Sequence, residues 1–151
     1  MLIRPATAAD VPAMMALERR AATAAHWSVA DYARLFGAGS QYIALVLEEQ
    51  DVEGFVVARG IGTEWELENI AVAGAARRRG LATRLLIELL ERARRGGARH
   101  MFLEVRESNR AARSLYERWD FVESGRRKDY YQDPAEDGVL YRFTFSSTPE
   151  K

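Results

Sequence analysis

The sequence contains no cysteine among its 151 residues. This absence excludes disulfide bonds, thiolate metal sites and a cysteine nucleophile, so any chemistry must use other side chains. Histidine is also scarce: His26 and His100 are too few for a metal site without clustered carboxylates, and no HExxH or related spacing occurs. We therefore expect no bound metal.

Long apolar runs and an excess of one charge are missing as well. No stretch is long and apolar enough to span a bilayer, and residues 1–5 do not form an apolar signal segment. The 22 Lys and Arg residues balance the 22 Asp and Glu residues, which argues against a general polyanion binder. We expect a cytoplasmic protein with neither nucleic acid nor a membrane as partner. The sequence does not determine the oligomeric state, for which a monomer is the simpler expectation.

The length and the hydrophobic fraction of 48% fit one globular domain. We expect this domain at residues 1–146 and a short polar tail at residues 147–151. Runs of β-forming residues predict strands at residues 2–4, 42–47, 55–58, 64–72, 101–105, 121–124 and 139–145. The polar segment before the last strand, which contains Tyr130 and Tyr131, is predicted to be a loop.

Capping residues mark the starts of the predicted helices. One helix is expected to begin after Thr7 and to run through Ala21, a short one after Ser28, and another after Asn109. A long amphipathic helix follows Gly80 and ends at Gly96. The linker before Ser28 is predicted to be an exposed elbow that carries Trp27, either as the wall of a pocket or as a staple for the helix.

The start of the long helix carries three arginines, an arrangement that is electrostatically unfavourable by itself. A helix start has exposed N–H groups and a partial positive charge, so Arg77, Arg78 and Arg79 should destabilise it unless an anion lies among them. Gly80 has no side chain to block a ligand from the backbone, and the small Ala82 keeps the next turn open. We interpret this stretch as a phosphate-binding loop, with a solvated basic turn as the alternative.

A second candidate is Glu104, which lies inside the mostly apolar strand at residues 101–105, where a charged residue needs a reason. The strand, helix, strand order predicts a right-handed crossover with two parallel strands, and ligands bind beyond the carboxyl ends of such strands. Gly80 and Glu104 are therefore expected to face the same ligand. The alternative is an ordinary ion pair between Glu104 and the nearby Arg106.

Other polar and aromatic residues have ordinary structural interpretations. Glu64, Glu66 and Glu68 alternate along one strand, which is typical of a solvated sheet face, although such a face also attracts a basic peptide. Tyr116 at helical spacing is typical of a core aromatic, and Asn109 of a helix cap.

The pattern Arg77-x-x-Gly80-x-Ala82, after a strand that ends Asn69-Ile70-Ala71-Val72, resembles the acyl-CoA pyrophosphate loop of the GCN5-related N-acetyltransferases (GNAT). The run from Leu103 through Glu104 to Asn109, followed by the helix with Tyr116, resembles the RimI-type branch, the ribosomal-protein alanine N-acetyltransferases. The resemblance covers nearly the whole chain. It implies an α/β GNAT acyl-CoA N-acyltransferase fold with a mixed, mostly antiparallel sheet, helices on both faces, and a splay between the strands that end near Val72 and Val105.

The same resemblance implies transfer of acetyl from acetyl-CoA to the N-terminal α-amine of a protein, an alanine-starting ribosomal protein in this branch. Glu104 would be the general base, directly or through water, and Tyr116 the general acid toward the CoA thiolate. The residues expected to bind acetyl-CoA are Ile70, Ala71, Val72, Arg77, Arg78, Arg79, Gly80, Leu81, Ala82, Thr83, Asn109 and Tyr116. The residues expected on the amine side are Trp27, Glu68, Asn69, Tyr130 and Tyr131.

Three positions depart from the pattern of this family. Arg77 replaces a frequent Gln and should still favour phosphate. Asp120 stands where Gly is common, so a turn with positive φ is expected there. His26 stands where Pro is frequent, which concerns the shape of the elbow and hence the choice of substrate.

Two other functions remain open at the level of the sequence. A GNAT enzyme that acetylates a small-molecule amine or lysine would use the same cofactor half. A non-catalytic acyl-CoA-binding regulatory module would also need the phosphate loop, but it would have no need of Glu104 and Tyr116 as base and acid.

Overall fold

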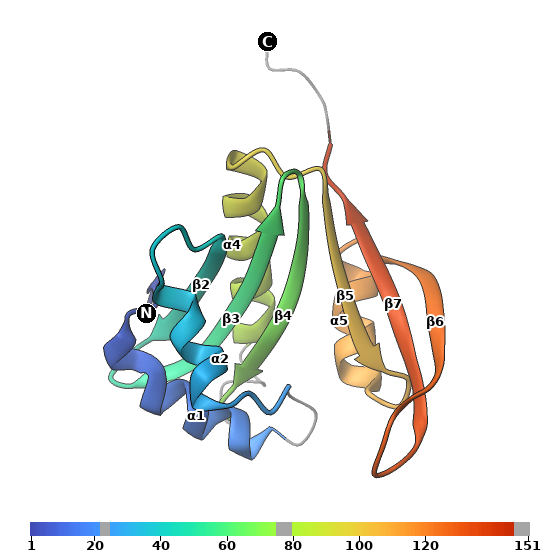
Figure 1. The fold of residues 1–151 in the computed structure, drawn as a ribbon, viewed down its shortest axis with the longest axis horizontal. Coiled ribbons are helices and arrows are strands. Elements are labelled where there is room, and N and C mark those ends of the chain that lie inside the picture. The colour runs from blue at the N-terminus through green and yellow to red at the C-terminus, as the bar shows by residue number, and fades with distance from the viewer. Residues whose placement is uncertain (22–24, 75–79, 147–151) are drawn as a thin grey trace.

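The computed structural model describes residues 1–21, 25–74 and 80–146 of the chain, and the expected polar tail lies outside these ranges. The described residues form one seven-stranded sheet in the order β1-β2-β3-β4-β5-β7-β6 (Figure 1). All neighbouring strands are antiparallel except β4 and β5, which are parallel. The strands are β1 (Leu2–Pro5), β2 (Tyr42–Glu48), β3 (Val52–Ile61), β4 (Glu64–Val72), β5 (His100–Arg106), β6 (Val122–Tyr131) and β7 (Glu136–Thr144).

Helices cover both faces of this sheet. The described helical elements are the 3-10 helices η1 (Ala8–Asp10) and η2 (Arg34–Phe36) and the α-helices α1 (Val11–Arg20), α2 (Val29–Ala33), α4 (Leu81–Arg95) and α5 (Arg110–Arg118). Side chains alternate between the two faces of a strand, so Val46 packs with Met14 of α1, whereas Leu45 packs with Leu85 of α4. Two hydrophobic cores therefore lie on opposite faces of the sheet. No helix within the described ranges is both long and apolar enough to cross a membrane.

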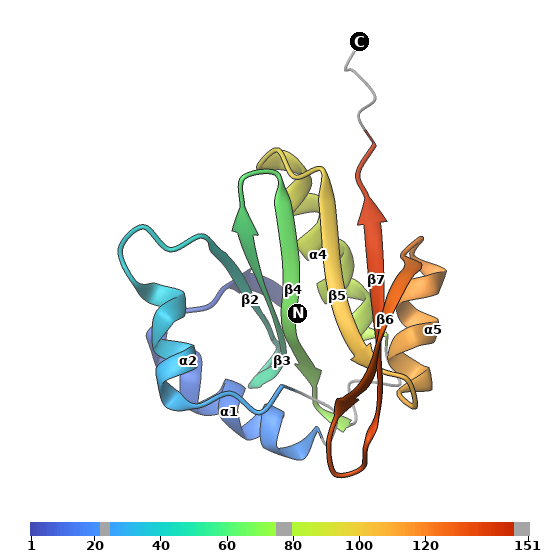
Figure 2. The ribbon, with the colours of Figure 1, turned by 45° about the vertical axis from the view of Figure 1, so that its right-hand side comes forward.

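The parallel strands β4 and β5 separate soon after they begin. Their ladder contains only the three pairs Glu64↔His100, Trp65↔Met101 and Glu66↔Phe102. Beyond these pairs the two strands diverge, and the tip of the β6–β7 hairpin lies at the end where the split opens (Figures 1 and 2). The expected splay between Val72 and Val105 is confirmed.

A β-bulge lies in β4 at the level of this split. Val57 pairs with Asn69 and Ala58 pairs with Leu67, which leaves Glu68 without a partner in the ladder with β3. A bulge re-aims the side chains that follow it. Glu64, Glu66 and Glu68 were expected to point to one face of the strand, and the bulge interrupts this regular arrangement at Glu68.

Local signals in the sequence explain where the helices begin. Thr7 with Asp10 and Ser28 with Asp31 form capping boxes, and the Asn109 side chain accepts a hydrogen bond from the Ala112 N–H, as expected. Asp120 has a φ of 72°, so the predicted positive-φ turn is also confirmed.

One expected loop is wrong. The segment that contains Tyr130 and Tyr131 belongs to β6, which runs to Tyr131, and the connection to β7 is much shorter than the sequence suggests. β6 lies at the edge of the sheet and pairs only with β7. The side chains of β6 are mostly exposed and polar or charged, so its sequence lacks the hydrophobic alternation by which a strand is recognised. The segment is a strand because its backbone pairs with β7.

The N-terminal end of the fold contains a partly buried ion pair that should respond to acid. Arg4 donates two hydrogen bonds to the Asp10 carboxylate, at 2.8 and 2.9 Å, and this arginine lowers the pKa of Asp10 to about 2. A carboxyl whose pKa is lower in the folded chain stabilises it above the unfolded pKa, and this contribution is lost as pH falls toward 2. We expect Asp10→Asn to lower the free energy of unfolding by about 2 kcal/mol at pH 7, and by about half as much at pH 3.

Urea unfolding of the wild type and the variant at both pH values measures this difference. Asp51→Asn, in the exposed turn before β3, is the matched control and should change stability by less than about 0.5 kcal/mol. An Asp10→Asn effect of equal size at pH 7 and pH 3 would contradict the linkage.

Candidate active site

The split between β4 and β5 opens into a cavity of about 1160 Å³. Its walls come from the carboxyl-terminal halves of both strands, the starts of α4 and α5, the segment before α2 and the end of β6. The predicted site residues that line it are Trp27, Glu68, Asn69, Ile70, Ala71, Val72, Gly80, Ala82, Thr83, Glu104, Asn109, Tyr116, Tyr130 and Tyr131. Residues that are distant in the sequence therefore meet in one cavity.

Two groups of predicted residues do not contribute to the described wall. Leu81 is buried in the core on α4, so its side chain packs against the sheet and does not line the cavity. Arg77, Arg78 and Arg79 lie outside the described residues.

Gly80 is the N-cap of α4 and has a φ of 73°. An added Cβ at this position would meet no atom within 4 Å, so the backbone conformation, and not crowding, requires glycine here. The start of α4 is consequently open to the cavity. Free N–H groups at a helix start, with the partial positive charge of the helix, favour an anionic ligand.

Glu104 projects from β5 where the strands separate, and its side chain is 16% exposed. Its Oε2 atom is buried and has no hydrogen-bond partner among the described residues, and it lies 3.5 Å from Nε of Arg127. Burial raises the pKa of Glu104, the nearby Arg127 opposes this shift, and Glu66 adds to it. The carboxylate is therefore a stronger base than an exposed glutamate.

The expected alternative, an ion pair of Glu104 with Arg106, is wrong. Arg106 instead pairs with Glu136 at 2.9 Å and lies over the ring of Tyr131, with its Cζ 4.5 Å from the ring centre. The sequence did not indicate the partner that the structure shows, Arg127, because the two residues lie on different strands.

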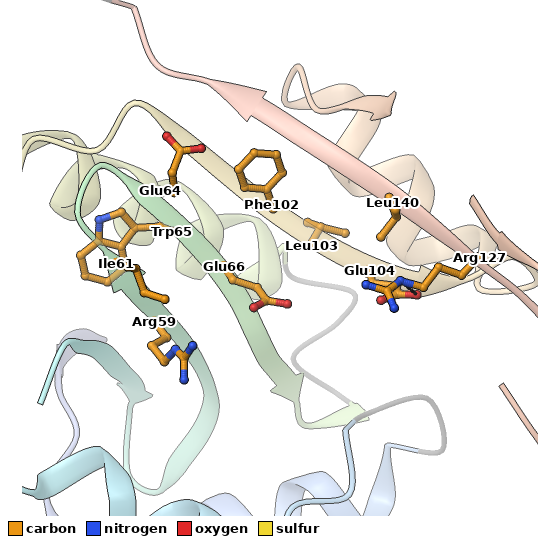
Figure 3. A pocket seen from close by; sticks show the side chains of 10 residues that line it. All are labelled: Arg59, Ile61, Glu64, Trp65, Glu66, Phe102, Leu103, Glu104, Arg127 and Leu140. Atoms are coloured by element: carbon orange, nitrogen blue, oxygen red, sulfur yellow. Dashed lines mark ion pairs between the residues drawn. The ribbon is translucent and has the colours of Figure 1, made fainter. Parts of the chain in front are cut away.

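Glu104 also borders a second, smaller cavity of about 310 Å³, which Figure 3 shows. The two cavities share Glu66, Leu103 and Glu104. In this view Glu104 and Arg127 approach each other on one side of the split, and Glu66 projects from β4 on the other side. Glu104 therefore lies where the two cavities meet.

Tyr116 on α5 lies within the core and also lines the larger cavity. Its side chain is 4% exposed, and its ring packs against Phe121 with the centres 5.4 Å apart. Its hydroxyl makes no hydrogen bond to another described residue, and burial raises the pKa of this phenol. Tyr116 is thus protonated at neutral pH and has a proton available to a group in the cavity.

Tyr130 and Tyr131 contact each other and two arginines at the end of β6. Their ring centres are 5.1 Å apart, and Arg127 lies over Tyr130 with its Cζ 5.1 Å from the ring centre. Tyr130 is exposed, whereas Tyr131 is partly buried and its pKa is raised by that burial. The two rings form an aromatic border of the cavity next to Glu104.

Behind the cavity wall, in contact with Trp27 and Asn69, lies a residue that the sequence did not single out. Glu18 of α1 is 3% exposed, and its carboxylate accepts hydrogen bonds from the Trp27 N–H and the Tyr32 hydroxyl, both at 2.6 Å, and from Nδ2 of Asn69 at 3.3 Å. In the sequence Glu18 precedes two arginines and resembles a solvated residue. Trp27 is half-buried beside Tyr32, and not exposed as expected.

Comparisons with known proteins agree with this geometry. The profile of the "Acetyltransferase (GNAT) family" matches residues 11–121. A relative from Escherichia coli strain K12, "[Ribosomal protein bS18]-alanine N-acetyltransferase", is 34% identical over 140 residues, which are 91% of this chain and 93% of the relative. The protein of the same name from Salmonella typhimurium strain LT2 is 37% identical over 141 residues, again 91% and 93% of the two chains.

A solved structure agrees with these sequences. The crystal structure of the ribosomal-protein-S18-alanine N-acetyltransferase from Escherichia coli superposes with a TM-score of 0.86 at 30% identity, and covers 99% of this chain and 96% of that one.

A mixed sheet split between two parallel strands, with a cavity at the split, is the architecture of an acyltransferase fold. The chain belongs to the GNAT family of acetyltransferases. It is an N-acetyltransferase whose acyl donor is acetyl-CoA. The cavity suits that donor, because the open start of α4 offers N–H groups to phosphate and the separated part of β4 has no partner strand on β5.

Proposed function

We propose that this acetyltransferase modifies the N-terminal α-amine of a protein that begins with alanine, and that a ribosomal protein is the acceptor. The relatives named above, which match over nearly their whole length, support this acceptor. Such a substrate would place the enzyme in the cytoplasm, where ribosomal proteins are made.

The observation that carries the proposal is the position of Glu104. Its carboxylate is largely desolvated, has one oxygen without a hydrogen-bond partner among the described residues, and lies where two cavities meet. A free α-amine has a pKa of about 8, so most of it is protonated at neutral pH and cannot attack. A base at this junction can take the proton from an amine that enters from the acceptor side.

The reaction then needs one base and one acid. Glu104 accepts a proton from the acceptor amine, directly or through water, while the nitrogen lone pair forms a bond to the thioester carbonyl carbon. As the carbon–sulfur bond breaks, the Tyr116 hydroxyl gives its proton to the departing sulfur, and Tyr116 is later reprotonated from solvent. The products are an N-acetylated amine and the free thiol of CoA.

The remaining predicted residues have binding roles in this proposal. Backbone groups of Ile70, Ala71 and Val72 would bind the extended arm of the donor as a neighbouring strand would. Gly80, Ala82 and Thr83, with the N–H of Leu81, surround the open helix start, and Asn109 caps α5 beside them. Trp27, Glu68, Asn69, Tyr130 and Tyr131 would line the amine side.

A peptide panel tests the acceptor. The enzyme is incubated with acetyl-CoA and short peptides, one of which begins with Ala, beside free lysine and an aminoglycoside, and the release of free thiol is followed. We expect selective turnover of the Ala-starting peptide. Preferred turnover of lysine or the aminoglycoside would overturn the proposed acceptor, and acetyl-CoA binding without turnover of any amine would favour a regulatory module.

Gly138 on β7 gives a separate prediction about Glu104. A Cβ added at Gly138 would overlap Oε2 of Glu104 and lie 3.2 Å from its Cδ, whereas the φ of Gly138 lies outside the left-handed region. Gly138→Ala should therefore fold but move the carboxylate, and we expect kcat/KM to fall by at least about tenfold. Gly125→Ala on β6, where the new Cβ would lie 3.4 Å from a Leu140 methyl group, is the matched control.

Steady-state kinetics with the Ala-starting peptide, together with a thermal melt, measure both glycine variants. A Gly138→Ala enzyme as active as Gly125→Ala would show that the position of the Glu104 carboxylate is not critical.

A further inference from the structure

We infer that the side-chain oxygen of Asn69 accepts a hydrogen bond from an N–H group of the incoming amine, and that Glu18 holds the Asn69 amide in the orientation that this requires. The inference rests on the proposed function and specifies how the acceptor is oriented. Glu18 would be a positioning residue that acts through Asn69.

The first step concerns the orientation of the Asn69 amide. Asn69 is 3% exposed, and its Nδ2 donates to Oε2 of Glu18 at 3.3 Å. An ionised carboxylate can only accept hydrogen bonds, and an amide has one donor end and one acceptor end. If the amide were reversed, Oδ1 would face the carboxylate and the two acceptors would repel each other. Glu18 therefore fixes which end of Asn69 is free.

The second step concerns the Glu18 carboxylate itself. Its other described hydrogen bonds come from the Trp27 N–H and the Tyr32 hydroxyl, and both of these groups are donors in this network. Three neutral donors around one buried carboxylate fix its position without an ion pair in the described part of the chain. The support behind Asn69 is consequently rigid.

The third step concerns the free end of Asn69. Oδ1 is buried and has no hydrogen-bond partner among the described residues, although Asn69 lines the larger cavity. Buried polar atoms in folded proteins are nearly always paired, so an unpaired carbonyl oxygen at a cavity wall indicates a partner that arrives with the ligand. A lone acceptor suits an N–H donor and disfavours a carboxylate or carbonyl oxygen. The amine that reacts, which carries N–H groups, has this chemistry.

Three variants test whether Asn69 presents a hydrogen-bond acceptor to the amine. Asn69→Leu removes the acceptor, and we expect the KM for the Ala-starting peptide to rise about tenfold while the Kd for CoA stays unchanged. Glu18→Leu removes the group that fixes the Asn69 amide, so Oδ1 is no longer held toward the cavity and KM should rise similarly. In Glu18→Gln the side-chain oxygen should stay with its two donors, the Trp27 N–H and Nδ2 of Asn69, because both bind the same oxygen of Glu18. The new NH2 group would face the Tyr32 hydroxyl, which can accept a hydrogen bond, so this conservative variant should keep a KM close to that of the wild type.

Tyr32→Phe is the matched control, because it removes a partner of Glu18 and leaves the Asn69 contact in place. It should lower the melting temperature without changing the acceptor KM. The inference is overturned if a folded Asn69→Leu enzyme keeps the wild-type KM, or if a folded Glu18→Leu enzyme has the same KM as Glu18→Gln. A wild-type preference for another amine would instead contradict the proposed acceptor, and the KM of that amine would still test the wall.

Discussion

Glu104→Gln should lower kcat/KM for an Ala-starting peptide by about 100-fold at pH 7, because glutamine fills the same space but cannot take a proton. The Kd for CoA should not change. The free energy of unfolding should be equal or higher at pH 7, because burial raises the pKa of Glu104 and the ionised form is therefore disfavoured in the folded chain. A loss of activity without a loss of stability would identify a functional carboxylate.

The pH dependence gives this prediction a second readout. At pH 7 only about a tenth of a free α-amine is deprotonated, and at pH 9 most of it is. The deficit of Glu104→Gln should therefore shrink as pH rises through about 8. In the wild type, activity should fall on the acid side as Glu104 becomes protonated, at a pH above the usual range of a glutamate because its pKa is raised.

The matched control is Glu91→Gln, at an exposed site on α4 where the carboxylate pairs with Arg94 and Arg95. Thiol release under steady-state conditions from pH 6 to pH 9 measures both variants. If Glu104→Gln retained the activity of Glu91→Gln at pH 7, Glu104 would not be the base and the proposed chemistry would be wrong.

Tyr116→Phe should lower kcat by about 100-fold, because the departing sulfur loses its proton donor. The ring remains packed in the core, and the hydroxyl has no hydrogen bond to another described residue, so its removal leaves no described group unpaired. We therefore expect the melting temperature and the Kd for CoA to stay close to those of the wild type.

Tyr141→Phe is the control for a tyrosine hydroxyl with a structural role. Its hydroxyl donates to Glu117 at 2.6 Å and accepts from Arg113 at 3.0 Å, and Tyr141 does not line either described cavity. This variant should lose about 1–3 kcal/mol of stability and keep its kcat. A Tyr116→Phe enzyme with unchanged kcat, or with a stability loss like that of Tyr141→Phe, would leave Tyr116 with a structural role only.

Much of the fold could be predicted because its signals are local. The strand that ends at Val72, the turn at Gly80 and the apolar stripe of α4 lie within one short stretch, and each rests on backbone conformation or helical periodicity. Asp120 is a similar case, because the positive φ at a turn depends on a few neighbouring residues. Local preference and tertiary structure agree in these places.

The parts that the sequence did not reveal depend on contacts between distant segments. β6 is a strand because β7 pairs with it, although its own residues are charged. Glu18 is buried because the segment with Trp27 folds over it, and nothing near Glu18 in the sequence indicates this. Arg127 reaches Glu104 only once three strands are side by side. These features follow from topology and not from spacing.

The divergence of β4 and β5 also gives the sheet two extra edges in the middle of the molecule. Unpaired strand edges invite strands of other chains and so promote aggregation. At the outer edges, β1 is only four residues long and ends in Pro5, and β6 carries exposed charges such as Arg126 and Lys128. The inner edges are protected by the angle between them, because a flat strand from another molecule cannot pair with both. The split therefore leaves room for an extended ligand along β4, and the same geometry disfavours continuation of the sheet into another molecule.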